Sequence, residues 1–111
     1  MFLMPSKYEP CGLNQLYSLR YGTVPIVRAT GGLADTITDY DLQRDSGTGF
    51  VFEEYSSGAM MTAIERALVV YSDSERWNRL MVRDMLQRWS WEESAHKYME
   101  LYDRICRRRR D

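Results

Sequence analysis

The chain has 111 residues, of which 44% are hydrophobic and 28% are charged, and its formal net charge is −1. This composition excludes an intrinsically disordered chain, and the near-neutral balance gives no overall field that would recruit nucleic acid or a membrane surface. No apolar run approaches the about 20 residues of a membrane-spanning helix. The two cysteines, Cys11 and Cys106, are far apart and lack metal-ligand spacing, so we expect reduced thiols and a cytosolic protein.

The beginning of the chain predicts a strand, a loop, a short helix and a second strand. The apolar run 2–4 is typical of a buried strand, and residues 13–21 have the apolar spacing of a helix. Gly22 follows that helix at the position where a left-handed residue is needed. The β-branched run 24–27 carries Pro25 near its start, where a strand tolerates proline. This order predicts a βαβ unit with parallel strands.

A third short strand is predicted at residues 49–52. It follows a glycine-containing loop at 30–35 and a polar, turn-rich loop at 38–49. Short apolar parallel strands usually have neighbours in the sheet and are covered on both faces. We therefore expect an α/β fold with about three short parallel strands and four to five helices, which looks like the end of a larger Rossmann-like domain.

The second half of the chain predicts helices. Two capping boxes, Ser72 with Glu75 and Ser90 with Glu93, mark the starts of the last two. The expected apolar faces are Met60, Met61, Ile64, Ala67, Leu68 and Tyr71 in the first helix, Trp77, Leu80, Met81 and Met85 in the second, and Ala95, Tyr98, Met99, Tyr102 and Ile105 in the last. We expect residues 1–111 to form a single partial domain, with a βαβ segment at 1–52 that carries the site and a helical segment at 53–111.

Several conspicuous residues favour a structural interpretation. Trp77, Trp89 and Trp91 are expected to pack at helices or helix junctions rather than to bind a sugar. His96 is the single histidine and has no neighbouring candidate ligand in the sequence, so we expect it at the surface. The four arginines 107–110 are expected to form a solvated tail.

The loop Glu9-Pro10-Cys11-Gly12 carries the first candidate chemistry. It joins a strand to a helix at the carboxyl edge of the predicted sheet, where open α/β folds bind ligands. Gly12 would let a ligand approach the backbone, and the amides of Gly12, Leu13 and Asn14 would face a phosphate. Since phosphate repels a carboxylate, Glu9 is expected to bind sugar hydroxyls. The alternative is an ordinary turn, in which Glu9, Cys11 and Gly12 have no ligand.

A second glycine loop, Thr30-Gly31-Gly32, follows the neighbouring strand. Two glycines there predict close backbone approach and free amides, and both loops would face one crevice. The three-residue motif is weak evidence by itself. A helix N-terminus can activate a nearby thiol, so we also hypothesise that Cys11 is reactive.

These motifs resemble a known family. Residues 5–17, 19–25, 28–33, 51–53 and 89–91 look like bacterial glycogen synthases and plant starch synthases, and the resemblance covers essentially the whole chain. It implies a retaining glycosyltransferase of the two-domain GT-B fold, which transfers glucose from ADP-glucose to an α-1,4-glucan. The resemblance implies no metal and no cofactor other than the substrate ADP-glucose.

The resemblance also assigns roles by position. Glu9 matches the first acid of the E-x7-E motif, which holds the donor sugar and is the expected catalytic residue. Tyr17 stands where related families have the second acid, a departure that is typical of the synthase branch. The positions expected to bind the donor are Cys11, Gly12, Leu13, Asn14, Tyr17, Thr30, Gly31 and Gly32.

The same comparison implies that part of the enzyme lies outside this chain. The N-terminal domain of the synthases and the Arg and Lys that clamp the diphosphate have no counterpart in the sequence, so we expect a catalytically inactive C-terminal fragment. The resemblance places it in the bacterial cytoplasm, or in a plastid if it is a plant protein. The alternatives are a non-catalytic module that binds a nucleotide sugar or a partner, and a chain that associates through an exposed sheet edge, either with itself or with a missing N-terminal half.

Overall fold

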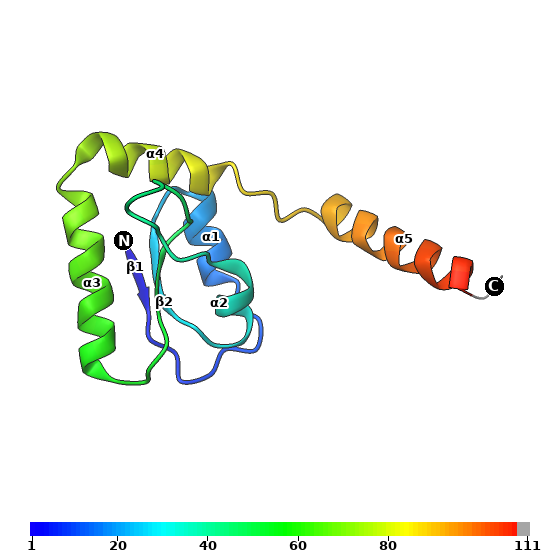
Figure 1. Cartoon of the computed structure of the whole chain (residues 1–111), viewed down its shortest axis with the longest axis horizontal. Helices are drawn as coiled ribbons and strands as arrows, with labels where there is room; N and C mark the ends of the chain where they lie inside the picture. The colour runs from blue at the N-terminus through cyan, green and yellow to red at the C-terminus, as the bar shows by residue number, and fades with distance from the viewer. Residues whose placement is uncertain (109–111) are drawn as a thin grey trace.

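A small parallel sheet lies between two layers of helices in the computed structural model, which describes residues 1–108 (Figure 1). In chain order the elements are β1 (Phe2–Met4), α1 (Asn14–Arg20), β2 (Pro25–Arg28), α2 (Gly31–Thr36), β3 (Phe50–Phe52), α3 (Ser57–Tyr71), α4 (Ser74–Met85) and α5 (Trp91–Arg108). The expected α/β class is confirmed, with three parallel strands and five helices in the described part of the chain.

The sheet has the order β1-β2-β3, and both pairings are parallel. Leu3 lies opposite Ile26, and Ile26 lies opposite Phe50, so β2 is the central strand. The three predicted strands agree with the observed ones to within one residue. Because both crossovers return to the same end of the sheet, the loops that follow β1 and β2 come together at its carboxyl edge.

Each face of the sheet has its own core. On one face Val24, Ile26 and Phe50 pack against α3 and α4, which contribute Ala67 and Leu80. On the other face α1 and α2 cover the sheet, and this second core consists of Met4, Leu19, Val27, Leu33 and Ile37. Figure 1 shows α3 on one side of the strands and the pair α1 and α2 on the other. The second core therefore joins α1 and α2 beneath the loops of the candidate site.

Residues 31–36 form a helix that the sequence pattern did not predict. The two glycines of α2 are poor helix formers, so the segment was expected to be a loop. Its helical conformation follows from packing, because Leu33 is fully buried in the second core. Tertiary burial thus outweighs the low intrinsic propensity of the glycines.

One of the two predicted capping boxes is wrong. Asp73 is the N-cap of α4, and its side chain accepts from the Arg76 amide, whereas Ser72 ends α3 and donates to Val69 O. Asp73 is the N-cap in place of Ser72 because Ser72 still has helical backbone angles. Before α5, the Ser90 hydroxyl oxygen accepts from the Glu93 amide, with a distance of 3.5 Å, as predicted.

The predicted helix faces are correct only in part. The buried positions of α3 are Ala63, Ala67 and Val70, whereas the predicted Met61, Leu68 and Tyr71 are exposed. Of the predicted face, Ala67 is buried, and Met60 and Ile64 are partly buried against the core. In α4 the predicted Trp77 and Leu80 are buried, but the same face also buries Asp84.

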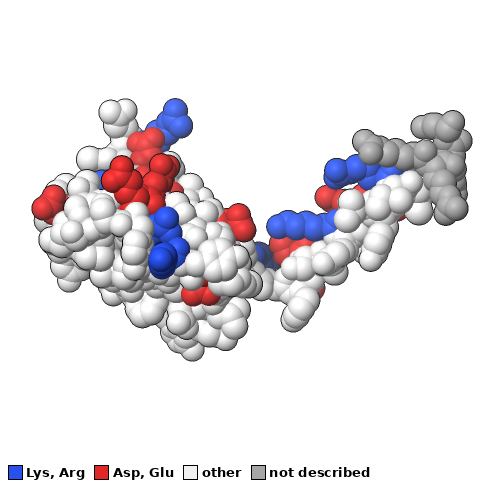
Figure 2. Space-filling view, turned by 90° about the horizontal axis from the view of Figure 1, so that it is seen from below, with Lys and Arg blue, Asp and Glu red and all other residues white. Residues whose placement is uncertain are grey.

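Helix α5 stands away from the rest of the molecule (Figure 1). Its described side chains are all exposed, and the apolar face predicted for it, which includes Tyr98 and Tyr102, is therefore uncovered. Figure 2 shows the charged atoms of this arm gathered along one side, with uncharged atoms on the other. The predicted packing of Trp91 is wrong, since its side chain is 89% exposed, and that of Trp89 is only partly met, since it is 45% exposed. Of the predicted basic tail, Arg109 and Arg110 lie outside the described residues.

None of the helices described between residues 1 and 108 combines the length and the apolar character needed to cross a membrane.

Candidate functional site

The two glycine loops meet at the carboxyl edge of the sheet. The Gly32 amide, at the start of α2, donates a hydrogen bond to the Glu9 carbonyl oxygen, with an N to O distance of 3.0 Å. A Cβ atom at Gly31 would collide with the Glu9 carbonyl oxygen, and one at Gly32 would collide with that of Cys11. Gly31 also has a left-handed φ of 44°, which favours glycine. Both glycines are therefore required by the contact between the loops.

This contact corrects part of the sequence prediction. The amides of the second loop were expected to be free for a ligand, but the Gly32 amide is bonded within the chain. Close backbone approach, the other expectation for these glycines, is found, although the partner is the loop 9–12 rather than a ligand. The contact thus joins the two predicted loops into one surface.

The first loop turns into α1 at a glycine that needs its conformational freedom. Gly12 has a left-handed φ of 71°, and Leu13 follows it as the N-cap of α1. The first turn of α1 has neither a side-chain cap nor an acidic residue. The same is true of α2, which begins after Thr30, whereas α3 and α4 are capped by Ser56 and Asp73. The two helices that begin at the joined loops therefore present uncapped first turns.

Gln15 and Thr36 form a contact between the loops that sequence reasoning missed. The Gln15 side chain is fully buried, and its Nε2 lies 3.0 Å from the carbonyl oxygens of Cys11 and Gly12. The same nitrogen lies 3.3 Å from Thr36 Oγ1, which in turn donates to the Gly32 carbonyl oxygen over 2.6 Å. A glutamine among the leucines of a helix has no sequence signal for such a role.

The remaining predicted site residues are exposed and lie at different places. Cys11 and Asn14 are exposed at the loop and at the first position of α1. Leu13 and Tyr17 line a surface hollow of about 480 Å³ together with Trp89. Tyr17 lies one turn along α1 and is not among the residues that join the two loops. The structure thus brings together Glu9, Cys11, Gly12, Gly31 and Gly32, and it leaves Tyr17 outside this group.

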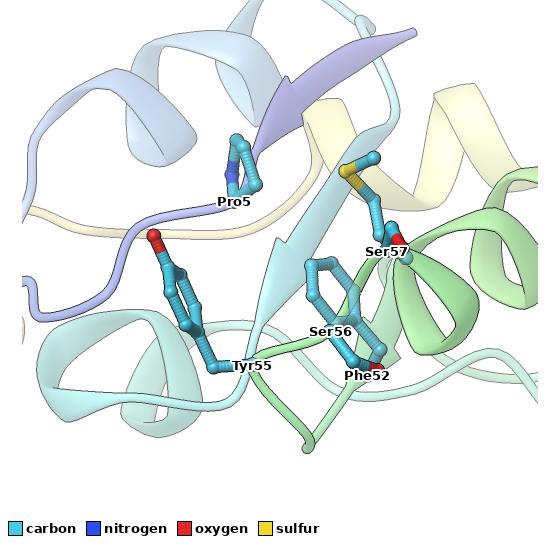
Figure 3. Close-up of a pocket in the computed structure, with 6 residues that line it drawn as sticks. Pro5, Phe52, Tyr55, Ser56 and Ser57 are labelled. Atoms are coloured by element: carbon cyan, nitrogen blue, oxygen red, sulfur yellow. The ribbon is translucent and has the colours of Figure 1, made fainter.

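A second hollow of about 260 Å³ lies at the same edge of the sheet, beyond β1 and β3. Its lining consists of Pro5, Phe52, Tyr55, Ser56, Ser57 and Met60. Figure 3 shows the Tyr55 side chain extending toward Pro5, at the end of β1. Arg28 connects the loops that surround this hollow. Its guanidinium donates hydrogen bonds to the carbonyl oxygens of Lys7 and Glu53, and it lies 5.4 Å from the centre of the Tyr55 ring. Arg28 thus ties the loop after β1 to the loop after β3.

His96 occupies the surface position that was expected for it. It is exposed on α5, where its Nδ1 lies 2.8 Å from the Glu92 carbonyl oxygen. Within residues 1–108, no three His, Cys, Asp or Glu side chains are grouped as metal ligands would be.

The fold and the joined loops define a class of protein. A parallel sheet with helices on both faces and glycine turns at its carboxyl edge is the architecture of Rossmann-like α/β domains, which bind ligands at that edge. Residues 1–80 match the family model described as Glycosyl transferases group 1, and the chain belongs to this family.

Relatives within this family are similar over most of the chain. Glycogen synthase 2 of Nitrosococcus oceani is 54% identical over 108 residues, which are 95% of this chain and 22% of that protein. The glycogen synthase of Kosmotoga olearia is 46% identical over 111 residues, which are 100% of this chain and 23% of that protein. The chain therefore spans less than a quarter of the length of these curated relatives.

A solved structure agrees with this assignment. The catalytic domain of Starch Synthase IV from Arabidopsis thaliana, bound to ADP and acarbose, matches with a TM-score of 0.81 and 42% sequence identity. The match covers 94% of this chain and 22% of that chain. The sucrose-phosphate synthase of Thermosynechococcus elongatus matches with a TM-score of 0.64 and 26% identity.

Proposed function

We propose that the chain carries part of the donor site of an α-1,4-glucan synthase, which transfers glucose from ADP-glucose to a glucan chain. The observation that carries the proposal is the junction of loops 9–12 and 30–32 at the carboxyl edge of the sheet. Similarity to glycogen synthases and to a starch synthase bound to ADP and acarbose supports the choice of donor and acceptor.

In this proposal different residues of the joined loops contact different parts of the donor. The amides of Gly12, Leu13 and Asn14, at the uncapped start of α1, would face the phosphates, because amides without a partner attract anions. Glu9 is half-buried beside them, so its carboxylate is proposed to bind the sugar hydroxyls. Cys11, Leu13, Asn14 and Thr30 would complete the contacts with glucose and phosphate. A ribose contact from Tyr17 has no support in the geometry, since Tyr17 lies a turn further along α1.

The chain by itself is expected to bind the donor weakly and to transfer no glucose. Retaining transfer needs donor and acceptor held together in a closed cleft, and the chain spans 22% of the length of its relative from Nitrosococcus oceani. The cytoplasm of a bacterium, as the resemblance implies, remains the predicted location.

Calorimetry with ADP-glucose tests the proposal. The chain should release or absorb heat on binding, and Glu9→Gln should weaken the affinity for ADP-glucose more than the affinity for ADP, because the carboxylate is proposed to contact the sugar. Glu100→Gln, at an exposed position on α5, is the matched control. Equal affinity of the Glu9→Gln variant and the unmodified chain for ADP-glucose would remove the proposed role of Glu9. Glucose incorporation into glycogen by the chain alone would contradict the predicted inactivity.

A second candidate function, association with another polypeptide, is favoured by the edge strand β1. This strand pairs with β2 alone among the described strands, and its Phe2 and Leu3 are exposed. Unpaired strand edges can add a strand from another chain. Light scattering should then give a mass above 13.1 kDa that falls to the monomer mass when a proline replaces Leu3.

A further inference from the structure

We propose that Gln15 and Thr36 act as a latch that positions the two loops for the donor, an inference that rests on the proposed function. Gln15 belongs to α1 and Thr36 is the last residue of α2, so the pair joins the two helices that begin at the loops. The latch would fix where the backbone of residues 9–12 and 31–32 lies before a ligand arrives.

Each hydrogen bond of this latch has a defined donor and a defined acceptor. The Gln15 amide group has two hydrogens, and its nitrogen lies within 3.0 Å of the Cys11 and Gly12 carbonyl oxygens and 3.3 Å of Thr36 Oγ1. The Thr36 hydroxyl uses its single hydrogen on the Gly32 carbonyl oxygen, so Thr36 Oγ1 can only accept from Gln15. Two hydrogens serve three acceptors, so one of them is shared between two acceptors. In this way one side chain holds the first loop directly and the second through Thr36.

A backbone hydrogen bond completes the connection between the two loops. The Gly32 residue receives the Thr36 hydroxyl on its carbonyl oxygen and donates its amide to the Glu9 carbonyl oxygen. The peptide groups on both sides of Gly32 are thereby fixed, one by the latch and one by the first loop. Loss of the Thr36 hydroxyl or the Gln15 amide should loosen the Gly32 amide even though neither side chain contacts it directly.

Packing alone does not explain why a glutamine, and not an apolar residue, occupies the buried position 15. Gln15 has no exposed surface, and its Oε1 has no hydrogen-bond partner among the described residues. An unsatisfied buried oxygen is unfavourable, and a leucine of similar size would avoid it in a core that already contains Leu19 and Leu33. The amide nitrogen is the part of the side chain that a leucine could not replace. Because Gln15 lies behind the loop and not at its surface, it is a positioning residue and not a catalytic one.

Hydrogen exchange tests the latch in the complete chain. Gln15→Leu and Thr36→Val should each raise the exchange rate of the Gly32 amide by about tenfold, measured by NMR. Thr36→Ser keeps the hydroxyl and should restore slow exchange. Thr62→Val is the matched control, because Thr62 on α3 donates to the Gly58 carbonyl four residues earlier, as Thr36 does to Gly32. Circular dichroism and the unfolding midpoint report whether each variant folds.

Affinity for ADP-glucose is the readout that a purely structural role would not change. Gln15→Leu and Thr36→Val should weaken binding by about threefold to tenfold, with Thr36→Ser and Thr62→Val close to the unmodified chain. Unchanged Gly32 exchange in both variants overturns the latch, and faster exchange with unchanged affinity overturns its positioning role. If the unmodified chain binds no ADP-glucose, the proposed function fails, and the exchange rates alone decide the latch. If Gln15→Leu does not fold, Thr36→Val and its rescue by Thr36→Ser decide it.

Discussion

The Gly32 amide and the Glu9 carbonyl oxygen, 3.0 Å apart, join loops that follow two different strands of the sheet. Backbone groups make this bond, so a substitution can affect it only through the space or the backbone conformation around it. The glycines on the α2 side allow the approach, because a side chain at Gly31 or Gly32 would meet a carbonyl oxygen of the other loop. The two loops are therefore expected to move as one unit.

Gly32→Ala should disrupt this junction. The new methyl group would overlap the Cys11 carbonyl oxygen, and backbone atoms cannot move aside as a flexible side chain can. We expect a loss of about 1–3 kcal/mol in the free energy of unfolding. Gly58→Ala is the control, since a Cβ there meets nothing within 4 Å and the position is in helix α3. That change should stabilise by about 0.5–1 kcal/mol. Urea unfolding of both variants checks the expected difference in sign.

Asp84 should make the chain less stable as the pH rises. Its carboxylate is fully buried on the core face of α4 with no hydrogen-bond partner among the described residues, and this burial raises its pKa to about 8, although the nearby Arg83 charge opposes the rise. The unfolded chain has the ordinary pKa of 3.8, so the folded chain binds more protons between the two values. The contribution of Asp84 to stability is then fully present below about pH 4, falls as the pH rises toward 8 and levels above it. Each tenfold difference in proton affinity between the folded and unfolded chain corresponds to about 1.4 kcal/mol.

Asp84→Asn isolates this effect, because it removes the titration at nearly constant size. The variant should exceed the unmodified chain in stability at pH 8.5 by more than at pH 5, measured by urea unfolding. Asp103→Asn, on the exposed arm, serves as the control. A difference between Asp84→Asn and the unmodified chain that is the same at both pH values would contradict the prediction.

Asp45 should have the opposite pH dependence. It accepts hydrogen bonds from Tyr40 and Arg79 and lies near Arg83, and these contacts lower the pKa of its carboxyl to about 2. Its contribution to stability is present above about pH 4 and is lost as the pH falls toward 2. Asp45→Asn should lower the free energy of unfolding by about 1 kcal/mol at pH 7. Asp45→Ala should lower it further, since φ is 49° at this position and asparagine tolerates such a value better than alanine.

Leu80→Ala and Ile105→Ala should differ strongly although both residues belong to amphipathic helices. Leu80 is fully buried against the sheet, so its truncation leaves a cavity and should reduce stability by about 2–5 kcal/mol. Ile105 is exposed on α5, and its truncation should change stability by less than about 0.5 kcal/mol. Thermal unfolding measures both. A large loss for Ile105→Ala would mean that α5 packs against the rest of the chain in solution.

Cys11 should be labelled by a thiol reagent more slowly in the presence of ADP-glucose. The prediction depends on the proposed donor site, because Cys11 is exposed on the loop that would bind the donor. Cys106 is also exposed but lies on the arm, so it is an internal control that the donor should not protect. Mass spectrometry of the two labelled peptides separates their rates. Equal rates at Cys11 with and without ADP-glucose would contradict the prediction.

The strands and some of the helix ends could be predicted because local features determine them. The β-branched run around Ile26, the left-handed Gly22 and the Ser90 cap all agree with the structure. Helix α2 could not be predicted, since it depends on the burial of Leu33 against residues distant in sequence. The exposure of the α5 face could not be predicted either, because an amphipathic pattern shows which side is apolar but not what covers it.

The meeting of the two loops at one edge of the sheet was predicted, but the contacts between them were not. Strand order places the loops at Glu9 and Gly31 on one edge, and motif spacing is enough for that inference. The bond that occupies the Gly32 amide, and the buried amide of Gln15, arise from tertiary packing between α1 and α2. The apolar spacing of residues 13–21 includes Leu19, which is buried, but also Leu13 and Tyr17, which are exposed. The other buried residues of α1, Gln15 and Ser18, are polar and give no such signal.

The arm formed by α5 has a consequence for how large the molecule will look in solution. The chain extends 56 Å along its longest axis and 25 Å along its shortest, and its radius of gyration is 16.6 Å. A compact domain of about 100 residues has a radius near 13 Å. A single copy should therefore leave a gel-filtration column early, at the volume of a heavier globular protein. Light scattering, which measures mass and not shape, should still give 13.1 kDa for that peak unless the edge of β1 has joined two copies.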